Sequence, residues 1–106
     1  MTPTARSLKH LRDTGWLVDV VERNVTRMVK KDLFGMFDLL ALRDGAVMFV
    51  QVTTGSNVSA RVRKIRENPD LPSVAAAGAV IVHGWRKSLR SGKWVLREVR
   101  IGQVEQ

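Results

Sequence analysis

The sequence predicts a single α/β domain in which helices flank a mixed β-sheet, with the element order α-β-β-β-α-β-β. Three observations lead to this fold class. Two apolar, β-rich runs flank the dipeptide Asp44-Gly45, amphipathic segments of helical period stand on either side of this pair, and two further β-rich runs follow. Because 106 residues bury one modest core but not two, we expect residues 1–106 to form one domain.

The N-terminal segment has the features of a helix. Thr2 stands in the capping position before Pro3, apolar residues follow at helical spacing, and Gly15 marks the end. The β-rich run 16–23 predicts the first strand. Residues 24–34 are mixed and basic, and we expect most of them to form a loop.

The run from 36 to 54 predicts a hairpin of two central strands. The Asp44-Gly45 pair favours a two-residue turn, because both residues tolerate the positive φ that such a turn needs. With Arg43 opposite Ala46, the turn sets these cross-strand pairs on one face: Leu42 with Val47, Leu40 with Phe49, Asp38 with Gln51, and Met36 with Thr53. The other face carries only apolar side chains, namely Phe37, Leu39, Ala41, Met48, Val50 and Val52. Both faces are therefore expected to be covered.

The second half of the chain continues the α/β order. The segment SNVSARVRKIREN begins with residues that favour a helix cap, and Pro69 ends it. Its apolar residues form one stripe: Val58, Val62 and Ile65. Residues 71–78 allow an additional short helix, and strands are expected over 79–85 and 93–101.

The charge balance points to a polyanionic partner. Eighteen Lys and Arg residues against ten Asp and Glu give a net charge of +8, which favours nucleic acid. The absence of cysteine excludes disulfides and thiolate metal sites, and two histidines cannot build a zinc site alone. No apolar run is long enough to cross a membrane and no signal peptide is apparent, so we expect a cytoplasmic protein that does not bind membranes.

A polar group interrupts the buried hairpin. Asp38, Gln51 and Thr53 gather at one end of one face, where opposed Cβ atoms lie ~5 Å apart. Burying an unpaired carboxylate costs several kcal/mol. The cluster therefore indicates a functional site, and a satisfied structural network is the alternative.

The segment KKDLFGMFDLLALRDGAVMFVQVTTGSNVSARVRKI, together with VHGWRK, resembles small phage and prophage proteins described as Holliday junction resolvase-like. These belong to the PD-(D/E)XK nuclease superfamily, and the resemblance covers about residues 10–101. It implies a restriction-endonuclease-like core and magnesium- or manganese-dependent cleavage of branched or structured DNA. It also implies a homodimer or higher homo-oligomer in the cytoplasm of a bacterial host cell.

The resemblance assigns roles to four residues. Asp38 matches the metal-binding Asp of the family, and the carbonyl of Val52 matches its backbone ligand. Gln51 stands where the family has its second acid, and Thr53 stands where it has Lys. A Gln oxygen is a hard ligand without charge, so the ion should bind less tightly. Thr53 can orient a water molecule but supplies no cation.

Nearby elements offer replacements for the missing charges. Glu22, on the first strand, would add a carboxylate if that strand neighbours the second, and the alternative is an ordinary charge at a strand end. Lys64 or Arg61, on the following helix, would supply the catalytic cation, and the alternative is a basic helix face turned to solvent.

Contacts with the DNA backbone are expected from three basic segments and from the helix start after the hairpin. The residues are Arg27, Lys30, Lys31, Ser56, Arg61, Arg63, Lys64, Arg66, Arg86 and Lys87. Two other functions remain open. One is a DNA-binding module that has lost catalysis, and the other is an assembly protein in which Asp38 and Gln51 form a structural hydrogen bond.

Overall fold

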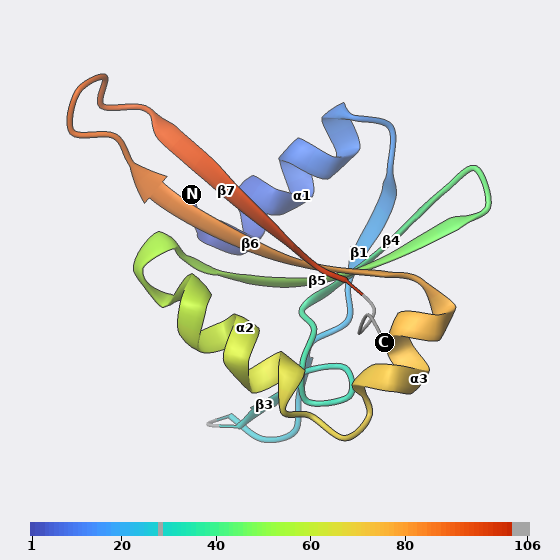
Figure 1. Ribbon diagram of the computed structural model, residues 1–106. Coiled ribbons are helices and arrows are strands. Elements are labelled where there is room, and N and C mark those ends of the chain that lie inside the picture. Colours follow the sequence, from blue (N-terminus) through green and yellow to red (C-terminus); the bar gives the residue numbers. More distant parts are fainter. Residues whose placement is uncertain (28, 103–106) are drawn as a thin grey trace.

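The computed structural model describes residues 1–27 and 29–102 (Figure 1). Its helices are α1 (Pro3–Asp13), α2 (Val58–Arg66) and α3 (Leu71–Ala77), and a 3-10 turn, η1 (Gly55–Asn57), precedes α2. The strands are β1 (Leu17–Val20), β2 (Arg23–Asn24), β3 (Lys30–Lys31), β4 (Leu39–Arg43), β5 (Ala46–Thr54), β6 (Ala79–Lys87) and β7 (Trp94–Ile101). Within these ranges, no helix combines the length and apolar character needed to cross a bilayer.

Five strands form a mixed sheet in the order β1-β4-β5-β6-β7. Strands β5 and β6 are parallel, and the other neighbours in this sheet are antiparallel. The parallel pair requires a crossover, which η1, α2 and α3 provide. The predicted α/β class with a mixed, helix-flanked sheet is therefore confirmed.

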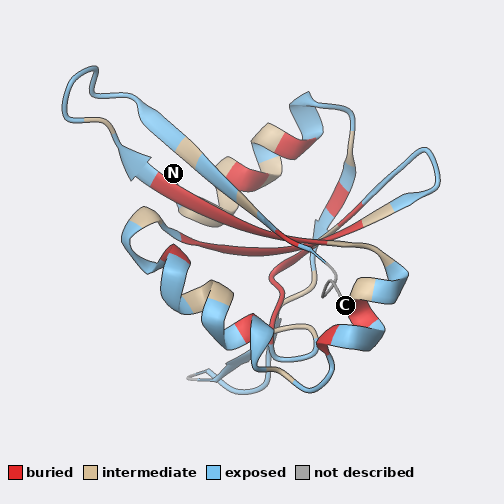
Figure 2. Cartoon of the chain, in the orientation of Figure 1, coloured by how far each residue is buried: buried red, intermediate tan, exposed pale blue. Residues whose placement is uncertain are grey.

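Helices cover both faces of the sheet, as expected for a buried hairpin (Figure 1). Helix α1 packs on one face through Leu11, against a cluster that includes Leu39, Ala41 and Val50. Helices α2 and α3 pack on the other face, and Figure 2 shows the burial of the central strands β5 and β6. The carboxyl end of β5 lies close to the start of α2, so polar residues near it border the second face.

Two local predictions are confirmed by the backbone. Thr2 caps α1 through its side-chain oxygen, which accepts a 3.1 Å hydrogen bond from Ala5 N. Asp44 and Gly45 both have positive φ, 50° and 80°, and Arg43 pairs with Ala46 as the two-residue turn requires. A register shift of one residue would have sent Asp38 and Gln51 to opposite faces.

The predicted hairpin begins too early in the sequence. The ladder between β4 and β5 ends at Leu39 and Val50, so Met36 does not pair with Thr53. Residues 33–37 instead form a tight turn closed by a bridge between Leu33 and Phe37. The turn rotates Phe37 away from the α1 face, and its ring packs on Phe49 with centroids 5.3 Å apart.

The segment 24–34 also contains more structure than a loop. Strands β2 and β3 pair antiparallel, Arg23 with Lys31 and Asn24 with Lys30. This small ribbon lies between β1 and the turn that precedes β4. It therefore brings the residues just after β1 close to those just before β4.

Candidate metal centre

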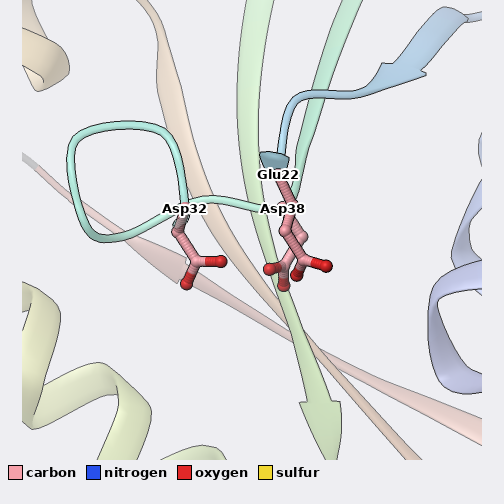
Figure 3. A group of neighbouring side chains, drawn as sticks. All are labelled: Glu22, Asp32 and Asp38. Carbon is pink, nitrogen blue, oxygen red and sulfur yellow. The ribbon is translucent and has the colours of Figure 1, made fainter. Parts of the chain in front are cut away.

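Three carboxylates from separate segments converge at the entrance to β4. Oxygens of Glu22, Asp32 and Asp38 all lie within 4.8 Å of one another. Figure 3 shows Asp32 leaving the loop before β4, with its carboxylate near those of the other two residues. Glu22 and Asp32 are half-buried, and Asp38 is 6 % exposed.

The backbone explains why these three residues meet. Leu33 N donates to Phe37 O at 2.9 Å, and Phe37 N donates to Leu33 O at 3.1 Å. Asp32 and Asp38 are the next residues outward from this bridge, so they flank it on the same strand pair. Val21 N donates to Asp38 O at 2.8 Å, which brings Glu22 beside them.

The side chain of Asp38 also accepts a hydrogen bond from the backbone of β5, in place of a backbone carbonyl. Its Oδ2 accepts a 2.8 Å hydrogen bond from Val52 N and a 2.9 Å hydrogen bond from Gln51 Nε2. The expected contact between Asp38 and Gln51 is therefore present, although the two residues lie one step beyond the last ladder pair. Because both donors bind Oδ2, they leave Oδ1 for other partners.

The side-chain amide of Gln51 has a defined orientation. Its Nε2 also donates to Val52 O, at 3.3 Å. The carbonyl accepts only, and the carboxylate accepts when ionised, so the nitrogen must face them. The expected ligand set of Asp38, Gln51 and Val52 thus forms a hydrogen-bonded network in this structure, with the Gln51 nitrogen rather than its oxygen on Asp38.

The carboxyl of Asp38 is strongly perturbed. Its pKa is raised from 3.8 to about 7, chiefly by burial and also by the nearby charge of Asp32 and by hydrogen bonds to Asp32 and Glu22. The hydrogen bond from Val52 N lowers the pKa and opposes part of this shift. Burial and the neighbouring carboxylates therefore disfavour the ionised form of Asp38.

A divalent cation fits this donor set. Three carboxylates supply hard oxygen ligands, which magnesium and manganese prefer. A bound ion would also favour the ionised form of Asp38, against the burial and repulsion that raise its pKa, and binding would release protons from the carboxyl groups. Glu22, Asp32 and Asp38 are the residues that would hold the ion.

The other predicted catalytic residues lie in different surroundings. Thr53 is buried on β5, beside Gly84 of β6. Lys64 is exposed on α2 and makes no ion pair within the described ranges. Its role as the catalytic cation stays a prediction. Lys30 is instead the cation nearest the carboxylates, with Nζ 3.6 Å from Glu22 Oε1.

Asp32 was missed in the sequence, although a signal for it exists. Asp and Gly are favoured at the first and last positions of a tight turn, and Asp32 and Gly35 have that spacing. Gly35 N donates to Asp32 O at 3.0 Å, and Phe34 and Gly35 both have positive φ. Recognising this turn would have placed Asp32 next to Asp38.

The basic residues expected to contact DNA are all on the surface except Arg61, which is half-buried. They occupy the β2–β3 ribbon, the η1–α2 segment and the end of β6. Three arginines gather in one place: Arg63 and Arg66 of α2 and Arg97 of β7 line a groove of about 480 Å³. Arg97 was not among the expected contacts.

A second polar network lies on the α1 face. Ser7 Oγ is 2.9 Å from His83 Nδ1, and His83 Nε2 is 3.0 Å from Glu98 Oε2. This is the order of groups in a hydrolase triad, but Ser7 and His83 are completely buried. Trp85 Nε1 also donates to Ser7 Oγ at 2.8 Å. The network therefore holds α1 on the sheet, where no substrate reaches the serine.

No protein-family model, curated protein or solved structure matches this chain. The resemblance to the PD-(D/E)XK superfamily accordingly stays a prediction from the sequence. Support for a function comes from the arrangement of the side chains themselves.

Proposed function

We propose that this chain is a magnesium-dependent endonuclease of the PD-(D/E)XK type that hydrolyses phosphodiesters of DNA. The observation that carries the proposal is the convergence of Glu22, Asp32 and Asp38 within 4.8 Å. When bound, the ion would polarise the scissile phosphate and lower the pKa of a water molecule. The preference for branched DNA and the homo-oligomeric state are supported only by the sequence resemblance.

The carboxylates compensate for one departure from the family pattern. Gln51 supplies no charge, but Glu22 and Asp32 add two carboxylates beside Asp38. The set therefore has the charge to hold a divalent cation without an acid at position 51. Gln51 keeps a positioning role, because its amide holds Asp38 Oδ2 and fixes the carboxylate plane.

A neighbouring lysine compensates for the other departure. Lys30 extends from β3 toward Glu22, and its ammonium group is well exposed. An exposed ammonium group beside the carboxylates can form an ion pair with a phosphate oxygen. Thr53 cannot form this ion pair, because its hydroxyl group is neutral. We assign to Lys30 the role for which Lys64 was the expected residue.

The second candidate function is a DNA-binding module of the same fold without catalysis. The hydrogen-bonded network of Asp38, Gln51 and Val52 favours it, because this network satisfies the buried carboxylate without an ion. The net charge of +8 supports DNA binding under both functions. Metal binding and cleavage are the properties that separate them.

The test compares the wild type with Asp38→Asn on a four-way junction and on linear duplex DNA, with Mg²⁺ or Mn²⁺. Asn keeps an acceptor for Val52 N but removes the charge, so the fold should persist. We expect cleavage to disappear and DNA affinity to stay equal or rise, since one negative charge near the phosphates is removed. Asp38→Ala should also abolish cleavage.

Asp44→Asn is the matched control. Asp44 lies in the turn of the same hairpin at positive φ, which Asn tolerates. Its cleavage rate should equal that of the wild type. If the wild type binds DNA, binds no Mn²⁺ by calorimetry and cuts neither substrate, the DNA-binding module replaces the nuclease.

A further inference from the structure

The β6–β7 hairpin projects beyond the helices and ends in an exposed tip (Figures 1 and 2). Leu89, at this tip, is fully exposed, more than any other large hydrophobic residue in the described part of the chain. Leucine at such a position contributes nothing to the core. We call residues 86–94 the arm.

The tip of the arm is a turn that is held by its own hydrogen bonds. Ser88 N donates to Lys93 O, and Gly92 N donates to Ser88 O, both at 2.8 Å. Ser88 Oγ accepts from Ser91 N at 3.3 Å, and Ser91 Oγ accepts from Lys93 N at 3.2 Å. Gly92 adopts a φ of 71°, which favours glycine. Leu89 is therefore held outward by an ordered backbone.

Only positive charges accompany this leucine. The arm contains Arg86, Lys87, Arg90 and Lys93, and it has no acidic residue. Arg86 and Lys87 were expected to contact DNA, whereas Arg90, Lys93 and Leu89 were not. The arm is a two-stranded ribbon whose cations surround one apolar side chain. Such a surface suits a polyanion that also has apolar groups within reach, as the bases of DNA do.

We infer that the arm enters a groove of duplex DNA, where its cations contact phosphates and Leu89 packs against the bases. The inference rests on the proposed function in taking DNA as the polyanion. The major groove of duplex DNA is wide enough for a two-stranded β-ribbon, and proteins also place β-strands in the minor groove. Apolar side chains of this kind act as wedges that partly unstack a base step. Branched DNA, whose bases are already less stacked at the junction, would accept the wedge at lower cost.

An anionic membrane is the other surface that attracts basic and apolar groups together. Stable binding there needs a broad apolar face or a lipid anchor. The tip offers one large apolar side chain among Ser88, Ser91 and Gly92. These residues favour a groove over a lipid surface, and both surfaces enter the experiments.

The first experiment measures DNA affinity by fluorescence anisotropy in the presence of a chelator, so that neither cleavage nor metal binding contributes. Leu89→Ser should weaken binding to a four-way junction about tenfold, because a buried apolar side chain is lost. Leu89→Met should restore most of the affinity because it returns an apolar side chain. Leu17→Ser is the matched control: Leu17 is 73 % exposed on β1, the far edge of the sheet, and its variant should bind as the wild type does.

Two further readouts separate the roles within the arm. Replacing Arg90 and Lys93 by Ala should lower the slope of log affinity against log salt by about 0.9 for each phosphate that is no longer neutralised. Leu89→Ser should leave this slope unchanged. A 2-aminopurine base near the junction should brighten when the wild type binds, since unstacking relieves its quenching, and it should stay dim with Leu89→Ser.

Equal affinities for Leu89→Ser and Leu17→Ser, with no difference in 2-aminopurine signal, would overturn the inference. Loss of binding to phosphatidylserine vesicles in Leu89→Ser, with unchanged DNA binding, would assign the arm to a lipid surface instead. Neither result touches the proposed nuclease function, which depends on metal-dependent cleavage and its loss in Asp38→Asn.

Discussion

The side-chain amide of Gln51 donates a 2.9 Å hydrogen bond to Oδ2 of Asp38, at the position where the resembled family has a second acid. This hydrogen bond satisfies a buried carboxylate. Because the amide of Gln51 is neutral, it adds no negative charge to the site. A metal centre and a structural network therefore predict the most different outcomes when Gln51 is replaced.

Gln51→Glu should destabilise the protein when metal is chelated. It removes the donor to Asp38 and Val52 O and adds a carboxylate next to Asp38, at a cost of about 1–3 kcal/mol. In a domain of this size the melting temperature should fall by about 4–8 °C for each kcal/mol. Mg²⁺ or Mn²⁺ should restore it, because the ion neutralises the added charge.

Thermal melts with chelator and with each ion check this prediction. Gln51→Leu is a useful comparison, since it removes the same donor without adding charge and should not respond to metal. A melting temperature of Gln51→Glu that stays low at saturating Mn²⁺ speaks for a structural network.

Asp32→Asn should weaken Mn²⁺ binding, measured by calorimetry, at least about tenfold, because the site loses one charged ligand. It should also lower the pKa of Asp38, since the Asp32 charge is one of the causes that raise it. Asp70→Asn, at an exposed carboxylate before α3, is the control and should leave the affinity unchanged. Equal affinities for both variants would remove Asp32 from the ligand set.

Lys30→Ala should reduce the cleavage rate about tenfold to a hundredfold, with little effect on the melting temperature, because its ammonium group is exposed and lies beside Glu22. Lys31→Ala is the matched control, since neighbouring residues of a strand point to opposite faces. Single-turnover assays at saturating DNA separate this effect from weaker binding. A loss of rate in Lys64→Ala alone would return the cationic role to Lys64.

Reversing Arg63 and Arg66 to Glu should weaken DNA binding and reduce its dependence on salt. The two residues line the groove between α2 and β7, and the slope of log affinity against log salt should fall by about 0.9 for each phosphate that the variant no longer neutralises. Arg100→Glu is a control, because Arg100 lies on β7 on the opposite side from Arg97. An affinity that responds neither to salt nor to the double reversal would leave nucleic-acid binding without support.

His83 should make the protein less stable as the pH falls below about 6.5, while Asp38, whose pKa is raised to about 7, should make it more stable over the same range. Burial lowers the pKa of His83, Glu98 opposes this shift, and an electrostatic contribution from His10 adds to it. At His83 the unfolded chain therefore binds a proton at a higher pH than the folded protein, and its contribution to stability decreases as pH falls through the unfolded value. One such proton changes the free energy of unfolding by about 1.4 kcal/mol per pH unit at most.

Urea denaturation at several pH values between 5 and 8 measures this dependence. His83→Gln keeps a donor for Glu98 but does not titrate in this range. It should be less stable overall, and the difference in stability between this variant and the wild type should shrink as the pH falls from 8 to 5. The same slope in His83→Gln and wild type would assign the acid sensitivity to other groups.

Local signals in the sequence were sufficient for most of the fold. Thr2 and Pro3 mark the start of α1, and Asp44-Gly45 sets the β4–β5 register, because caps and two-residue turns depend on the residues within them. The proximity of Asp38 and Gln51 followed from that register. Where the sequence signal was local, the structure agrees with it.

The candidate site depends on less local features. The turn around Phe34 requires a positive φ in a residue that rarely adopts it, and apolar alternation alone placed Met36 and Phe37, which belong to this turn, in the predicted strand. Phe37 was therefore assigned to the wrong face, and Asp32 was missed as a site residue. Lys30 reaches Glu22 only through the β2–β3 ribbon, whose two-residue strands are too short to show a period.

The sheet consists of two antiparallel parts joined by a single parallel seam, β5 against β6. Each hairpin beside the seam closes over a short turn, whereas the seam joins strands separated by the whole α2–α3 crossover. Local contacts form quickly, and contacts distant in sequence form slowly. We therefore expect the seam to form last and to set the folding rate. Until it closes, the carboxylates before β4 and the basic arm after β6 belong to separately moving halves of the chain.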